Sequence, residues 1–252
     1  MEKVLTQFTI NKIAQGNLED SPFKDINYRR LSDDPNKFII RKSYLGNDVA
    51  CRPTKVKFDN TLDSQNIQAQ LVILEKLKES PNILKFYGLS EVDDYQVMVF
   101  EWVEVNLMEI YTKNDIDWDL KALIALDICR GLLFLHSCDI LHHDIRCKNI
   151  MITSRLGAKI SNFQYAKIKT DSTIPIPRVD DMIPWMAPEK LNGFKYNFKS
   201  WEGIPQIRAT LQQIFLKLVE LSEICKKPSY QYVLYPDGHI DFDGSNSNSN
   251  PS

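Results

Sequence analysis

The residues whose types and spacing best support chemistry lie in one polar loop between two apolar runs. Asp144 and Asn149 stand in this loop, with Arg146 between them. A carboxylate held there can accept a hydroxyl proton, and an amide oxygen can ligate a hard cation such as magnesium. A guanidinium beside them can stabilise negative charge that develops on a phosphate. A polar turn that merely joins two core strands would look similar, so the flanking segments must decide.

The hydrophobic pattern of the flanking segments predicts the elements that position this loop. Apolar runs within 37–58, turned at Gly46-Asn47, indicate strands. Apolar positions at steps of three and four indicate helices at 63–78, 117–136 and 209–225, and Asp117 is a suitable N-cap for the second. We also expect a buried strand at 95–103, a short helix within 1–20 that ends at Gly16-Asn17, and a disordered Ser/Asn-rich segment at 244–252.

Length and composition narrow the class of protein. The chain has 252 residues, of which 43% are hydrophobic, enough for one large domain or two closely packed lobes. A formal net charge of -2 argues against a general binder of nucleic acid or anionic membranes. The 5 cysteines show neither C-x-x-C nor Cys/His ligand spacing, which argues against disulfides and zinc and favours a reducing compartment. We expect no signal peptide or membrane span, and a cytoplasmic location with the nucleus also compatible.

Several segments, in chain order, resemble motifs of the eukaryotic protein kinase family. The run 140–152, ILHHDIRCKNIMI, resembles the catalytic loop H-R-D-L-x-x-x-N, with His142, Asp144 and Asn149 in register and His143 in place of the arginine. Four further stretches resemble kinase elements: SPNILKFYG at 80–88 the H-P-N-I-L-x-x-x-G link, ICRGLLFLH at 128–136 the helix before the catalytic loop, AKISNFQYA at 158–166 the K-I-x-D-F-G segment, and WMAPE at 185–189 the A-P-E element. The resemblance covers roughly residues 38–225.

The resemblance implies an α+β fold with two lobes. The N-lobe would be an antiparallel sheet plus one helix, and the C-lobe would be mainly helical and shortened. The expected boundaries are an N-terminal helix and linker at 1–30, the N-lobe at 31–102, the C-lobe at 103–229 and a tail at 230–252, disordered from about 244. The shortening follows Glu189, because the chain leads straight to a W-x-x-x-P-x-x-R element in place of a long hydrophobic helix. Arg208 of that element would pair with Glu189.

The resemblance also implies ATP and Mg²⁺ as cofactors and assigns the reacting groups. Asp144 would be the catalytic base, Arg146 would lie near the transferred phosphoryl group, and Asn149 would ligate magnesium. Asn162 stands where the K-I-x-D-F-G element has its metal-binding aspartate, and it would be the second metal ligand.

The remaining assignments concern the nucleotide. Arg52 stands where the V-A-I-K strand has its phosphate-binding lysine, with Lys55 and Lys57 as alternatives in another register. Gln70 stands where a glutamate orients that lysine. The other expected contacts are Glu101 and Val103 of the hinge, which bind adenine through backbone groups, Phe100 at the gatekeeper position, and Met151.

Several positions depart from the kinase pattern. Only Gly46 is present where a glycine-rich loop is expected, Arg52 replaces lysine, Gln70 replaces glutamate, and Asn162 and Gln164 replace the aspartate and glycine of D-F-G. Arginine for lysine is not a conservative change, because its planar fork is larger than an ammonium. A neutral amide is a weaker ligand for magnesium than a carboxylate. Phosphoryl transfer depends on positioning and charge stabilisation, so these losses compound.

Three hypotheses for function follow. The first is a kinase-like signalling protein with impaired or absent catalysis, a pseudokinase scaffold or nucleotide-binding module. The second is a weakly active ATP-dependent protein kinase of Ser/Thr type, although the ILKFYG and hinge segments suggest the tyrosine-kinase-like branch. The third is a truncated gene product with no independent role. The expected partners are ATP and a protein substrate or partner kinase, with neither nucleic acid nor membrane.

Overall fold

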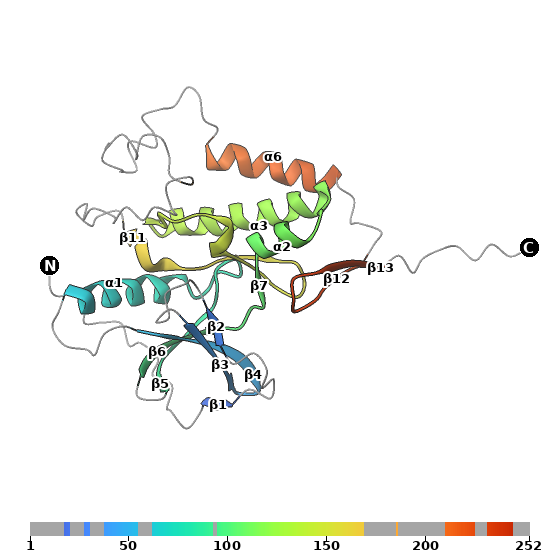
Figure 1. Cartoon of the computed structure of the whole chain (residues 1–252). Helices are drawn as coiled ribbons and strands as arrows, with labels where there is room; N and C mark the ends of the chain where they lie inside the picture. The colour runs from blue at the N-terminus through green and yellow to red at the C-terminus, as the bar shows by residue number, and fades with distance from the viewer. Residues whose placement is uncertain are drawn as a thin grey trace, which may run out of the picture.

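The protein has two layers of structure, a sheet with one helix and a helical region above it (Figure 1). The computed structural model describes residues 18–20, 28–30, 38–54, 62–92, 95–168, 185, 210–224 and 231–243. Two predictions fall outside these ranges: the leading helix within 1–20, of which only 18–20 is described, and the tail from 244. The proposed Glu189–Arg208 pair and the alternative lysines Lys55 and Lys57 also lie outside them.

The larger sheet is antiparallel and has the strand order β1-β3-β4-β6-β5, with β2 also paired to β3. Its strands are β1 (Leu18–Asp20), β2 (Tyr28–Arg30), β3 (Phe38–Tyr44), β4 (Asn47–Pro53), β5 (Phe86–Val92) and β6 (Tyr95–Glu101). Both short strands pair with the same edge of β3, since Leu18 lies opposite Tyr44 and Tyr28 lies opposite Ile40. The predicted strands within 37–58 and at 95–103 are therefore confirmed.

The turn between β3 and β4 uses left-handed backbone. Leu45 has φ 52° and Gly46 has φ 75°, and two successive positive φ values suit a tight hairpin in which glycine carries no steric penalty. Arg52 lies at the other end of β4 from this turn. Gly46 therefore serves the hairpin and lies at the wrong end of the strand to cover a phosphate near Arg52.

Helix α1 (Leu62–Leu77) confirms the helix predicted at 63–78 and packs one side against the main hydrophobic core. Leu71, Ile73, Leu74 and Leu77 are each at most 2% exposed. A smaller cluster, including Val49, Cys51, Val97 and Val99, fills the space on another face of the sheet. Because β4 and β6 supply residues to both clusters, burial on two faces explains their nearly continuous apolar sequences.

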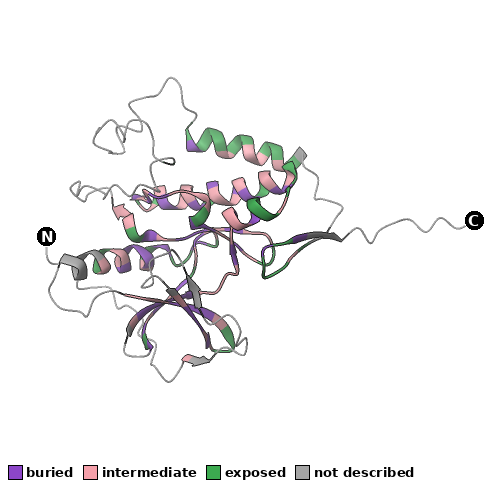
Figure 2. Cartoon of the chain, in the orientation of Figure 1, coloured by how far each residue is buried: buried purple, intermediate pink, exposed green. Residues whose placement is uncertain are grey.

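The second layer is mainly helical. Its elements are β7 (Val105–Asn106), α2 (Leu107–Lys113), α3 (Trp118–Ser137), β8 (Ile140–Leu141), β9 (Ile150–Ile152), β10 (Ala158–Ile160), β11 (Lys167–Ile168) and α6 (Leu211–Ile224). The predicted N-cap is confirmed, because the Asp117 carboxylate accepts a 2.8 Å hydrogen bond from the backbone N–H of Leu120. Helix α6, predicted at 209–225, lies along α3 and is mostly exposed on its outer side (Figure 2). Among the described helices, none combines the length and apolar character needed to cross a bilayer.

A hairpin that the sequence did not predict, β12 (Gln231–Leu234) and β13 (Ile240–Asp243), closes the described part of the chain. Ile240 is 4% exposed and belongs to the main core. Asn114, which caps the end of α2, donates to the carbonyl of Gly238 at 2.7 Å and accepts from the N–H of Ile240 at 2.9 Å. The hairpin is thus attached to α2 by polar groups and to the core by Ile240, with the partly buried Leu234 packed against the same core.

Backbone hydrogen bonds also tie the two layers together. The N–H of Leu84, before β5, donates to the carbonyl of Ile160 at 2.9 Å, and the N–H of Ile160 donates to the carbonyl of Asn82 at 2.9 Å. On β6, the Glu101 carboxylate forms an ion pair with Lys159 of β10 at 2.7 Å. The expected α+β architecture, with an antiparallel N-lobe sheet and a C-lobe that has few helices in its described part, is confirmed. The residue boundaries assigned to the domains stay a prediction.

Candidate functional site

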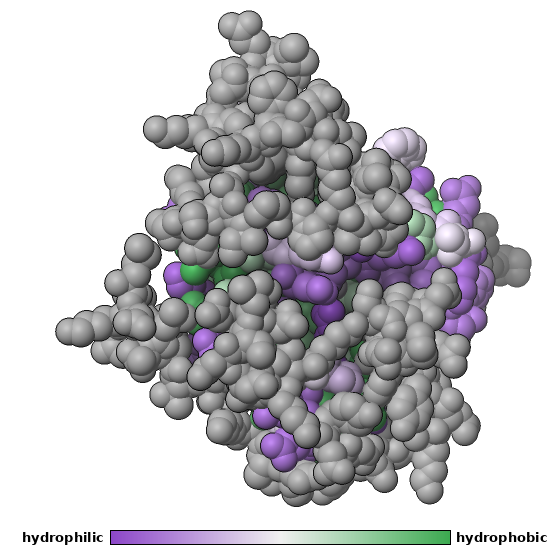
Figure 3. Space-filling model, turned by 60° about the vertical axis from the view of Figure 1, so that its left-hand side comes forward, coloured by the Kyte–Doolittle hydropathy of each residue, from purple (hydrophilic) through white to green (hydrophobic). Residues whose placement is uncertain are grey.

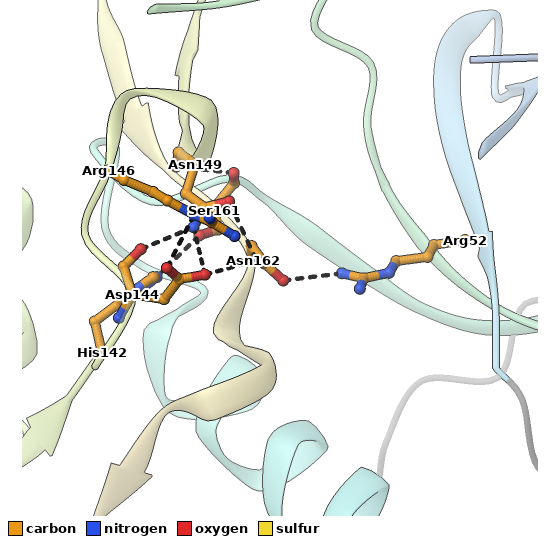
Figure 4. Close-up of polar contacts among 7 residues, drawn as sticks. All are labelled: Arg52, His142, Asp144, Arg146, Asn149, Ser161 and Asn162. Carbon is orange, nitrogen blue, oxygen red and sulfur yellow. Dashed lines mark hydrogen bonds and ion pairs between the residues drawn. The ribbon is translucent and has the colours of Figure 1, made fainter. Parts of the chain in front are cut away.

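The polar loop predicted to carry chemistry lies between β8 and β9, and its residues meet the end of β10 (Figure 4). Cys147–Asn149 forms one turn of 3-10 helix, which directs Asn149 back toward Asp144. Asp144 and Asn149 are buried, with 4% and 6% of their surfaces exposed. Buried polar groups require partners, and here each finds them in the same small cluster.

Asp144, Asn149 and Asn162 converge, as the sequence predicted. The amide nitrogen of Asn149 donates to Asp144 Oδ2 at 2.7 Å and to the Asp144 carbonyl at 2.8 Å. The amide nitrogen of Asn162 donates to the same carboxylate oxygen at 3.3 Å and to Asn149 Oδ1 at 3.1 Å. Asn162 has φ 65°, a left-handed conformation that asparagine adopts more readily than most residues. This conformation lets its side chain reach the loop.

His142 supports the loop from beneath. Its Nδ1 accepts the backbone N–H of Asp144 at 3.2 Å, so Nε2 carries the proton and donates to the Ser161 carbonyl at 2.9 Å. The ring packs edge-on against Phe163, with 4.8 Å between ring centroids. Burial lowers the pKa of His142 to about 4, while the hydrogen bond to Ser161 acts in the opposite direction. The imidazole is therefore neutral at physiological pH.

Arg146 lies against the carboxylate instead of projecting away from it. Its Nε lies 3.0 Å from Asp144 Oδ1, an ion pair that lacks the alignment of a hydrogen bond. Together with the two amides on Oδ2, this contact occupies both oxygens of Asp144. The positive charge of Arg146 and the donated hydrogen bonds compensate the buried carboxylate.

Arg52 reaches the cluster from β4. Its Nη1 donates to Asn162 Oδ1 at 3.3 Å, and its Nη2 donates to Gln164 Oε1 at 3.3 Å. Within the described part of the chain, no hydrogen bond joins Arg52 to Gln70 of α1, the residue expected to orient it. Burial lowers the pKa of Arg52, with a smaller opposing effect from Tyr165, but a guanidinium stays charged at any physiological pH. Sequence reasoning noted Gln164 only as a departure and missed it as a partner of Arg52.

The expected nucleotide contacts at the hinge lie at the junction of the layers. The Glu101 carboxylate accepts from the ammonium of Lys159 and, at 2.6 Å, from the backbone N–H of Lys85. Adenine recognition by the hinge backbone stays a prediction. Val103 follows β6, and Phe100 is buried against Phe86 with ring centroids 5.3 Å apart. In the space-filling view, hydrophilic residues gather across the middle of the visible face (Figure 3).

Two further residues lie near the hinge: Met151, which was predicted to contact the nucleotide, and Arg41, which was not predicted. Met151 lies on β9 between Lys159 of β10 and Asn106 of β7, and its side chain is half-buried. Arg41 of β3 was not predicted: it is 6% exposed, forms ion pairs with Asp48 and Glu104, and lies 4.5 Å from the centroid of the Trp102 ring. The sequence signal for this cluster was an arginine that directly follows the apolar run 38–40 within a strand.

The residues at the predicted metal position fit magnesium poorly. The two expected ligands are neutral amides, and Asn162 Oδ1 already accepts from the Arg52 guanidinium. Magnesium favours carboxylates and keeps an octahedral shell of oxygens, whereas a cation beside Asn162 would face a like charge. Among the described residues, no group of three or more His, Cys, Asp or Glu side chains could hold a metal.

An antiparallel sheet with one helix, joined by a hinge to a helical lobe whose loop presents a buried aspartate and asparagine, defines a protein kinase-like domain. The chain belongs to the family of protein tyrosine and serine/threonine kinases, because the sequence pattern of that family matches its residues 41–201. This is a family of phosphotransferases, and its kinase domains generally use ATP and Mg²⁺ and act on protein substrates.

Individual relatives agree with this assignment. "Probable serine/threonine-protein kinase kinX" of Dictyostelium discoideum is 29% identical over 167 residues, which are 64% of this chain and 15% of that protein. A second probable serine/threonine-protein kinase of D. discoideum is 28% identical over 200 residues, 75% of this chain and 46% of its own length. A probable LRR receptor-like serine/threonine-protein kinase of Arabidopsis thaliana is 34% identical over 122 residues, which are 44% of this chain and 12% of that protein. The chain spans less than half the length of these relatives.

Proposed function

We propose that this chain is a catalytically impaired protein kinase-like domain of intracellular signalling, which binds ATP and engages a partner kinase or another protein. The observation that carries the proposal is the environment of Asn162. Its amide links Asp144, Asn149 and Arg52 into a closed network of protein contacts at the position where a kinase holds its metal. The reaction depends on that metal to position and neutralise the phosphates, so its weak binding reduces the rate by orders of magnitude.

A second candidate is a weakly active kinase with serine or threonine as the acceptor. The favouring observation is that Asp144 and Asn149 lie in direct contact within a loop that His142 supports by a hydrogen bond. The kinases named above as relatives carry serine/threonine in their names, which favours a hydroxyl of that class over tyrosine.

The substitution Asn162→Asp separates the two candidates. A carboxylate at this position adjoins Asp144, and the two negative charges favour a bound cation. We expect the wild-type chain to transfer radiolabelled phosphate from Mg-ATP at background level and Asn162→Asp to raise transfer by about tenfold or more, equivalent to about 1.4 kcal/mol of barrier. The gain should vanish in the double variant Asn162→Asp/Asp144→Asn.

Clear wild-type transfer that Asp144→Asn abolishes would favour the weakly active kinase. The control is Arg155→Met, an exposed position in the turn between β9 and β10, at the other end of these strands from the site.

A further inference from the structure

Arg52 is a half-buried cation without a compensating anion in the described part of the chain. Its hydrogen-bond partners, Asn162 and Gln164, are neutral amides. The neighbouring carboxylate, Asp144, is already paired with Arg146 at 3.0 Å. Charges removed from water are normally paired, because an unpaired charge loses its favourable hydration and gains no attraction to an opposite charge. Among the described residues, the site therefore holds an excess positive charge that an anion would balance.

The guanidinium is also held in place to meet such an anion. Asn162 Oδ1 accepts from Nη1 (Figure 4) and Gln164 Oε1 accepts from Nη2, each at 3.3 Å, so these two contacts fix the plane of the guanidinium. A guanidinium carries more N–H donors than these two bonds use, and its geometry matches a phosphate or carboxylate. Since fixed donors lose little entropy on binding, this arrangement favours phosphate recognition.

We propose that the Arg52 guanidinium supplies the positive charge that a kinase site normally takes from its metal, so that the site binds the phosphates of a nucleotide without a divalent cation. This inference rests on the proposed function, because it assumes that the anion is the phosphate chain of ATP. Magnesium does not assist this mode of binding. A cation coordinated by Asn162 Oδ1 would share that oxygen with the Arg52 guanidinium and would lie beside a like charge.

Calorimetric titration of the whole chain with ATP in EDTA, and again in excess magnesium, tests the inference. We expect ATP to bind in EDTA with a Kd equal to or below that in magnesium. Arg52→Met, which keeps much of the side-chain length and removes the charge, should weaken metal-free ATP binding at least about tenfold and leave adenosine binding unchanged. Asn162→Asp should pair Arg52 with a carboxylate, weaken metal-free binding, and make binding depend on magnesium.

The matched control is Arg155→Met, which removes an exposed arginine outside the site and should bind ATP like the wild type. ATP binding that requires magnesium would overturn the inference while the proposed nucleotide-binding function stands. An Arg52→Met variant that binds metal-free ATP as tightly as the wild type would also overturn it. Failure of both ATP and adenosine to bind under either condition would remove the nucleotide-binding function together with the inference.

Discussion

At the scale of single residues, the buried histidine His142 fixes the loop that carries Asp144. Both ring nitrogens are used, one as donor to Ser161 and one as acceptor from the Asp144 backbone. Protonation would place a hydrogen on Nδ1, directly against the N–H that it now accepts. The same event would introduce a charge among buried groups, which explains why the pKa of His142 lies at about 4.

This arrangement predicts a pH dependence of stability. The folded pKa of His142 is about 4 against an ordinary value of 6.5, so below 6.5 the unfolded chain binds a proton that the folded chain does not. The free energy of unfolding should therefore fall as the pH decreases from 6.5 toward 4, by up to about 3 kcal/mol from this residue, and be unaffected by it above 6.5. Urea denaturation across this range, compared with His142→Gln, measures the contribution as the difference in slope.

The control for this comparison is His239→Gln in the hairpin turn, which leaves His142 and its surroundings in place. Equal slopes for wild type and His142→Gln would show that the histidine titrates alike in the folded and unfolded chains.

At the scale of elements, the contact between α3 and β10 depends on a glycine. A Cβ added at Gly131 would lie 2.8 Å from Ile160 Cδ1 and 3.1 Å from the carbonyl oxygen of Asn82. Ile160 and Asn82 also form one of the backbone hydrogen bonds that tie the two layers together, in which the N–H of Ile160 donates to the carbonyl of Asn82. The close approach of α3 to this junction therefore requires a residue without a side chain.

Helix propensity alone would make Gly131→Ala stabilising by about 1 kcal/mol. We expect the opposite, a loss of about 1–3 kcal/mol in the free energy of unfolding, because the methyl group overlaps Ile160 and the backbone of Asn82. Denaturant unfolding checks the sign.

The double variant Gly131→Ala/Ile160→Val provides the control, because valine lacks the Cδ1 atom that the new methyl group meets. We expect the double variant to lose less stability than the sum of the losses in the two single variants. If Gly131→Ala were as stable as the wild type, the close packing would not exist in solution.

At the scale of the whole molecule, the hairpin β12–β13 joins the far end of the sequence to the segment that follows the hinge. Asn114 provides the polar connection to Gly238 and Ile240, and the Ile240 side chain enters the main core. Lys113 adds a hydrogen bond from its ammonium to the carbonyl of Asp237. The stability of the C-lobe thus depends on residues more than a hundred positions apart.

Asn114→Ala should therefore lower the free energy of unfolding by about 1–3 kcal/mol, because the N–H of Ile240 and the carbonyl of Gly238 lose their partner. Thermal denaturation and limited proteolysis of the hairpin measure the effect. Thr112→Ala, exposed on the same helix, is the control. Unchanged melting and unchanged proteolysis of Asn114→Ala would mean that the hairpin does not rely on this residue.

Local patterns predicted much of this fold. Helices α1, α3 and α6 follow from apolar spacing, and the Asp117 cap follows from one side chain acting on the next turn. The convergence of Asp144, Asn149 and Asn162 also followed, because the motifs hold their relative positions. Gln164 was not foreseen as the partner of Arg52, since the two are 112 positions apart and their contact depends on the backbone at Asn162. The sequence also contains signals for the hairpin, namely the turn sequence Pro236-Asp237-Gly238 and the alternation of apolar and acidic residues over Ile240–Asp243, but two strands of four residues are too short for these signals to be decisive.

The exchange between Asn82, Leu84 and Ile160 has a further consequence for how a ligand enters and leaves. Two backbone hydrogen bonds and the Glu101–Lys159 ion pair hold one margin of the sheet against β10. Breaking them together would cost more than bending the connection at 102–104, so that margin acts as a fixed rotation axis. Opening of the molecule is then a swing about this axis, widest at the opposite side of the sheet, where β1 and β2 pair with β3, and ligand exchange should proceed past that side.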